Sequence, residues 1–178
     1  MKLETLKEVV VELGFSGCKL MDTKEIPLNE AFRSHCEENI CGMYGASYAC
    51  PPACGTPEEM AAKIHAFRQA LVLESAWRVK NVFDSSETMP PRKEHNVWML
   101  QLKDLLQRHG IPSLMIGASH CTLCDRCKIL DGQPCVNPDL KFSCVSAYCV
   151  DMMSLTQKLG WDMLYRGEEL KFYGILLF

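Results

Sequence analysis

Four cysteines in the last third of the chain have the spacing of a metal-thiolate loop. They are Cys121, Cys124, Cys127 and Cys135, in the pattern C-x2-C-x2-C-x7-C. Three thiols at intervals of three residues converge on one centre only if the backbone wraps around it, which directs N–H groups at the sulfur atoms. A third cysteine at this spacing is typical of bacterial ferredoxins, whereas structural zinc sites usually separate two C-x2-4-C pairs by a longer loop. The run therefore predicts an iron–sulfur centre, with zinc as the alternative.

A second group of cysteines precedes a strong helix start, where Thr56 and Glu59 have the spacing of a capping box. Its members are Cys36, Cys41, Cys50 and Cys54. Pro51 and Pro52 follow one of them, as proline follows the last cysteine of a ferredoxin run. The N-terminus of the next helix stabilises anionic thiolates nearby. The irregular spacing leaves three arrangements open: a second iron–sulfur cluster, one zinc ion, or three bound thiols and one free thiol.

Further cysteines extend this picture. The chain has eleven in 178 residues, an odd total that argues against a disulfide framework. Cys18 is expected in the core. Cys144 and Cys149 are expected to pack, with a disulfide or a metal as alternatives. In two-cluster ferredoxins the last cysteine of one run serves the other cluster, so Cys50 or Cys135 can belong to either centre.

Helical and strand patterns alternate around these two groups. Apolar periodicity predicts helices over residues 3–13, from Thr56 to about Phe67, from Pro90-Pro91 to Gly110 and over 152–159, and strands near 17–22, 70–75, 111–117 and 172–178. Such alternation indicates an α/β fold with a single sheet of about four strands, largely parallel or mixed. We expect one domain over residues 1–178, with cysteine-rich insertions at about 33–56 and 119–149 that contain ten of the eleven cysteines.

The charge and hydropathy of the chain argue against some classes of function. There are 19 Lys and Arg against 22 Asp and Glu, a net charge of -3, without a basic run, so nucleic acid is not an expected partner. No apolar stretch reaches the roughly 20 residues of a membrane span, and the N-terminus carries acidic residues where a signal peptide is apolar. We expect a cytoplasmic protein that does not bind membranes; the oligomeric state is not encoded in these patterns. His35 and His120, each beside a cysteine, are read as neighbours rather than ligands.

The chain resembles a family of small proteins of unassigned function that are described as predicted metal-binding proteins and are typical of anaerobic bacteria and archaea. The shared features are Cys41 with Tyr44-Gly45, Cys50-Pro51-Pro52, the run from Cys121 to Pro138, Ala147-Tyr148 and Asp151. The resemblance implies an iron–sulfur or other metal site and supplies no reaction. Relatives have Ser and Gly where this chain has Cys144 and Cys149, and the resemblance does not extend to Cys54.

Three functions follow from eight thiols in two loops. The leading hypothesis is an iron–sulfur protein, with one or two 4Fe-4S clusters, that exchanges electrons with a redox protein partner. An alternative is an iron–sulfur enzyme or sensor, in which one iron keeps an open position because the first loop supplies only three firm thiolates. The third is a binding module whose loops are stapled by zinc. Whether the chain is an enzyme is left open.

Overall fold

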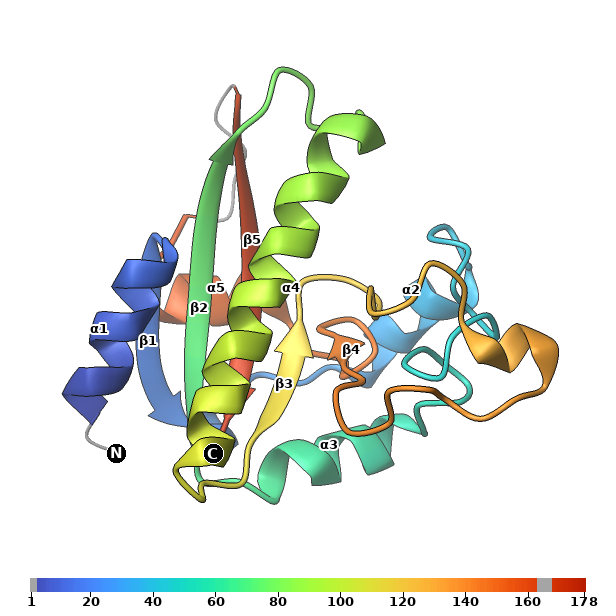
Figure 1. Cartoon of the computed structure of the whole chain (residues 1–178), viewed down its shortest axis with the longest axis horizontal. Helices are drawn as coiled ribbons and strands as arrows, with labels where there is room; N and C mark the ends of the chain where they lie inside the picture. The colour runs from blue at the N-terminus through green and yellow to red at the C-terminus, as the bar shows by residue number, and fades with distance from the viewer. Residues whose placement is uncertain (1–2, 163–167) are drawn as a thin grey trace.

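A computed structural model shows one open sheet of five strands with helices on both faces (Figure 1). It describes residues 3–162 and 168–178; residues 1–2 and 163–167, which the expected domain includes, lie outside the described residues. The elements are α1 (Leu3–Leu13), β1 (Gly17–Asp22), α2 (Arg33–Glu37), α3 (Pro57–His65), β2 (Gln69–Arg78), α4 (Ser85–Arg108), β3 (Leu114–Gly117), β4 (Ser143–Cys144), α5 (Met152–Lys158) and β5 (Glu169–Leu177). The prediction of a mixed α/β fold is confirmed.

The strand order is β1-β2-β5-β3-β4. All four predicted strands are present, and the fifth is the two-residue β4, which the sequence did not indicate. Neighbouring strands are antiparallel except β3 and β4, which are parallel and pair Gly117 with Cys144. The sheet is therefore mixed and mainly antiparallel. A helix between two strands does not force a parallel crossover, because the second strand can enter the sheet from either end when the connection is long.

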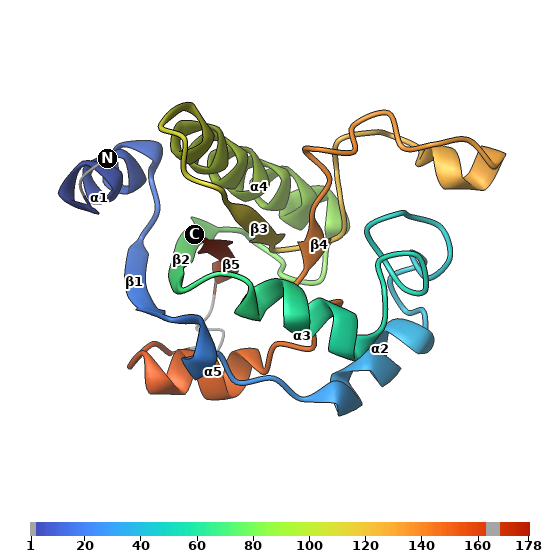
Figure 2. The ribbon, with the colours of Figure 1, turned by 90° about the horizontal axis from the view of Figure 1, so that it is seen from below.

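Helices cover both faces of the sheet, with α1 and α4 on one side and α3 and α5 on the other (Figure 2). Successive residues of β2 point alternately into the two layers, so Ala70 and Val72 pack on α3 and α5, whereas Leu71 and Leu73 pack on α1 and α4. Burial on both faces explains the continuous apolar run in this strand. Cys18 packs against the α1 and α4 layer, as expected.

The helix ends follow local sequence signals. Thr56 and Glu59 form the predicted capping box of α3, which fixes where the first cysteine-rich segment ends. The prediction that the long helix begins after Pro90-Pro91 is wrong, because Asp84 caps it six residues earlier and both prolines lie inside α4. Among the described helices, none is long and apolar enough to cross a membrane.

Candidate metal centre

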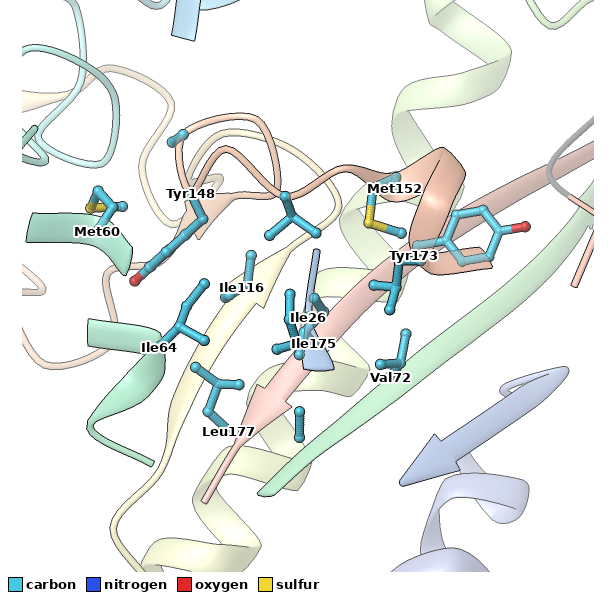
Figure 3. Packing of buried hydrophobic residues seen from close by; sticks show 14 of the residues in the cluster. Ile26, Met60, Ile64, Val72, Ile116, Tyr148, Met152, Tyr173, Ile175 and Leu177 are labelled. Atoms are coloured by element: carbon cyan, nitrogen blue, oxygen red, sulfur yellow. The ribbon is translucent and has the colours of Figure 1, made fainter. Parts of the chain in front are cut away.

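The two cysteine-rich segments lie side by side beyond the β4 edge of the sheet. Figures 1 and 2 both place the segment after α2 next to the segment between β3 and β4. The Tyr48 hydroxyl donates a hydrogen bond of 2.8 Å to the carbonyl of Gln133, which joins the two segments directly. Figure 3 shows the Tyr148 ring among Met60, Ile64 and Ile116, so the end of the later segment is packed into the core. The fold thus brings ten cysteines to one end of the molecule.

One group of thiols, which we call the first site, lines a cavity of about 400 Å³. Its members are Cys36, Cys41, Cys50 and Cys144. Three of them come from the predicted first group, and the fourth comes from β4, in the other segment. The parallel pairing of β4 with β3 carries this thiol to the cavity.

Tight turns position the thiols of the first site. Asn39, Gly42 and Gly45 all have positive φ, so the chain reverses repeatedly after α2. The Asn39 side chain accepts a hydrogen bond from the backbone N–H of Tyr44, and the Gly45 N–H donates to the carbonyl of Pro51. These two hydrogen bonds hold the successive turns before Cys50 together, and the positions with positive φ require residues that tolerate the left-handed conformation.

Burial makes the thiols of the first site hard to ionise. It raises the pKa of Cys36 to about 11 and that of Cys50 to about 12, and it also raises the pKa of Cys144. Backbone N–H groups of Ser146 and Ala147 act against this at Cys144. These three thiols are therefore protonated at neutral pH, and a metal must displace their protons on binding.

Cys54 lies apart from the other members of its predicted group. It does not line the first-site cavity but is buried in the core with Met60 and Ile64. Its sulfur is 3.9 Å from Nη1 of Arg33, and this guanidinium also hydrogen-bonds to the Cys149 thiol. The sequence grouped Cys54 with its neighbours by proximity along the chain, whereas the turn before α3 directs the side chain inward.

Arg33 is a buried cation, only 8% exposed, beside the first site. It donates to the carbonyls of Gly55 and Ala147, at 3.1 and 3.0 Å. Among the described residues it has no carboxylate partner, and its Nε has no hydrogen-bond partner. Its charge counteracts the effect of burial on the pKa of Cys36. An isolated buried cation is costly, so an anionic centre at the first site would compensate it.

The second site consists of the ferredoxin-like run. Cys121, Cys124, Cys127 and Cys135 all line one cavity of about 30 Å³, closed on another side by Ser47, Tyr48 and Ala49. All four thiols are half-buried. The structure thus brings together every thiol that the sequence placed in this group.

Hydrogen-bond donors point at the sulfur atoms of the second site. Burial acts to raise the pKa of Cys127, but backbone N–H groups of Ile129, Tyr48 and Lys128 and the Ser47 hydroxyl lower it below its ordinary value. The Asn137 amide lies 3.6 Å from the sulfur of Cys124. This is the inward wrap of N–H groups that the spacing predicts, and it stabilises thiolates.

Ser47 stands between the two sites. It is 4% exposed, and hydrogen bonding by its hydroxyl lowers the pKa of Cys127 and counteracts the burial that raises the pKa of Cys50. One hydroxyl can reach both sulfur atoms only if the two sites share a wall. No sequence signal distinguishes this serine from others, and the same holds for Arg33 as a contact of three loop segments.

Both sites fit thiolate-bound metal by the chemistry of their donors. All eleven cysteines are free thiols. In the part of the chain that the structure describes, no three or more His, Cys, Asp or Glu side chains form a group that could hold a metal ion as they stand. The sites are therefore defined by the cavities that their thiols line. His35 and His120 lie on the wall of the first-site cavity.

Comparison with known proteins identifies a family. Residues 19–178 match the profile of a family described as predicted metal-binding protein (DUF2284). No curated protein and no solved structure matches the chain. The match covers both cysteine-rich segments and all strands except the first two residues of β1.

Proposed function

Because the chain belongs to this family of predicted metal-binding proteins, we propose that it is an iron–sulfur protein with two 4Fe-4S centres that exchanges electrons with a redox partner. The observation that carries the proposal is the pair of four-thiol sites that meet at Ser47. Two adjacent clusters would form a short path for single electrons. The side chains in these cavities that suit a chemical role are the thiols, and not an acid–base pair.

Each centre has its own ligand set in this proposal. The first site uses Cys36, Cys41, Cys50 and Cys144, so that the thiol of β4 takes the place that the sequence analysis gave to Cys54. The second site uses the four cysteines of the ferredoxin-like run. Backbone and side-chain donors to sulfur stabilise the thiolates, and the surrounding loops limit contact with water.

The surface near the sites supports a protein partner. Among the described residues, five of the nine exposed large hydrophobic side chains lie on the two cysteine-rich segments: Ile40, Tyr44, Leu130, Val136 and Leu140. Charges there nearly cancel, with one arginine and two glutamates in residues 33–56 and three residues of each sign in 119–149. Apolar contact, rather than the small net charge of the chain, would therefore hold the partner.

Metal and sulfide analysis of protein purified without oxygen tests the proposal. We expect about eight iron and eight sulfide per chain. Cys144→Ser should lower iron to about four, whereas the matched variant Cys54→Ser should retain about eight. The two cysteines belong to neighbouring segments, but only one lines the first-site cavity.

Each other result has a definite meaning. Less than one iron per chain, or zinc alone, contradicts the iron–sulfur proposal and favours a zinc-stapled scaffold. Loss of iron in Cys54→Ser but not in Cys144→Ser would return the ligand set to the one that spacing alone suggests. A fully loaded protein that no reductase or acceptor reduces or oxidises would contradict electron transfer.

A further inference from the structure

The first-site cavity has a cationic wall. Arg92 of α4 lines it together with Ser119 and His120, and Lys93 lines the adjoining cavity of about 280 Å³, which shares His120. None of the residues that line the first-site cavity is an aspartate or a glutamate. Among the described residues, Arg92 forms no ion pair. The first-site cavity therefore has a cation and no carboxylate in its lining, whereas Asp125 lines the adjoining cavity together with Lys93.

Contacts fix the guanidinium of Arg92. Its central carbon lies 5.3 Å from the centre of the Phe172 ring, in cation–π contact, and its Nη1 is 3.8 Å from the sulfur of Met89. Its Nε is buried and has no hydrogen-bond partner. A buried donor without an acceptor is costly, and a ligand that supplies an oxygen would remove this cost.

The ligand class follows from the remaining lining. A planar guanidinium held by a ring binds a carboxylate through two parallel hydrogen bonds. Ile40, Met43, Ala118 and Val145 add apolar surface beside the thiols, which suits the hydrocarbon part of such a ligand.

We propose that this cavity binds a small carboxylic acid, with its carboxylate on Arg92 and its hydrocarbon part beside the thiols of the first site. This binding function goes beyond electron transfer and does not depend on which metal the thiols hold. It places a substrate or effector of the protein at the first site, which Arg92 lines, rather than at the second, which Arg92 does not line.

Fluorine NMR of the metal-loaded protein tests the proposal with a matched pair of probes, 4-fluorobenzoate and its neutral isostere 4-fluorobenzamide. We expect the acid to bind at least about tenfold more tightly than the amide, since only the acid can pair with the guanidinium. Arg92→Met should weaken binding of the acid about tenfold and leave the amide unchanged, whereas Arg92→Lys should recover part of the loss. Arg108→Met, at an exposed arginine on the same helix, should change neither.

Three results would overturn the proposal. Equal binding of acid and amide would show that charge is not recognised. Loss of binding in Arg68→Met but not in Arg92→Met would place the probe in the cavity of about 840 Å³ at the other end of the sheet, which Arg68 lines. No binding of benzoate, succinate or acetate at about 10 mM, with an altered metal spectrum in Arg92→Met, would assign the arginine to the metal centre itself.

Discussion

The two sites contain the same number of thiols but are built differently. The second site takes its cysteines from one run of fifteen residues around a cavity of about 30 Å³. The first takes them from α2, the turns that follow it and β4, around a cavity of about 400 Å³. Donors to sulfur lower the pKa of Cys127 in the second site, whereas burial raises the pKa of Cys36 and Cys50 in the first.

This difference shows which part of the protein organises each site. The backbone of one loop directs N–H groups at the second site, so the thiolate of Cys127 is favoured before metal arrives, although burial raises the pKa of Cys121 in the same site. The first site depends on contacts between distant segments, and it holds neutral thiols until an ion replaces their protons. We infer that a perturbation of loop packing will affect the first site before it affects the second.

Replacing Arg33 should produce the largest difference in metal content between the two sites. Arg33→Met removes the charged donor to the buried carbonyls of Gly55 and Ala147, which should lower the free energy of unfolding by about 2 to 4 kcal/mol. It also removes the cation that would compensate an anionic first centre. We expect iron content to fall to about four per chain, with the second site retained.

Metal analysis and urea unfolding measure both effects. Arg108→Met, which removes an exposed guanidinium paired with Asp104, is the matched control and should change the free energy of unfolding by less than about 0.5 kcal/mol. If Arg33→Met lost both centres equally, the inferred independence of the second site would be wrong.

In the metal-free protein, the thiols Cys36 and Cys50 of the first site and Cys127 of the second should change the free energy of unfolding with pH in opposite directions. Cys36 and Cys50 keep their protons to pH values of about 11 and 12 when folded, but release them near pH 9 when unfolded. The folded state therefore binds more protons above pH 9, and the free energy of unfolding falls as the pH rises through this window. Cys127, whose pKa is lowered, contributes in the opposite direction.

Urea unfolding of reduced, metal-free protein between pH 7 and 10.5 checks the sign. Cys50→Ala should flatten the decline in the free energy of unfolding above about pH 9, whereas Cys127→Ala should remove a rise below that pH. Parallel profiles for the two variants would mean that the thiols of both sites ionise alike.

The difference in construction also explains what the sequence could predict. The second group could be proposed from the sequence because its spacing is a local property of one loop, and its four cysteines line one cavity in the structure. The capping box of α3 and the buried run of β2 were recognised for the same reason, since each depends on neighbours along the chain.

Contacts between distant segments were not visible in the sequence. Cys144 reaches the first site through the pairing of β4 with Gly117, and a two-residue strand has no periodicity to detect. Cys54 is close to Cys50 along the chain, but its turn directs the side chain to Arg33 and the core. Strand direction likewise depends on how long connections return to the sheet, which periodicity does not specify.

Ser47 is the point where the two sites are expected to respond together. Ser47→Ala removes the hydroxyl that acts on both Cys50 and Cys127, and should cost about 1 kcal/mol of stability. Loss of a donor to a thiolate disfavours the more negative, reduced cluster, so both midpoint potentials should fall by up to about 40 mV. Redox titration followed by EPR measures this.

A matched serine gives the control for this shift. Ser34 donates only to the carbonyl of Ala31 on the exposed side of α2, so Ser34→Ala should leave both potentials unchanged. A shift of one potential alone in Ser47→Ala would show that the hydroxyl serves a single site and that the shared wall does not couple them.

The smallest expected effect concerns the link between the segments. Tyr48→Phe removes the hydroxyl that bonds to Gln133 but keeps the ring and the backbone N–H that acts on Cys127. The lost hydrogen bond contributes about 0.5 to 1.5 kcal/mol, so a chelator should remove metal from the second site up to about tenfold faster. Release from the first site should not change, because this bond closes only the second cavity. Faster release from the first site instead would mean that the two segments loosen as one unit and that the second site, too, depends on packing between distant parts of the chain.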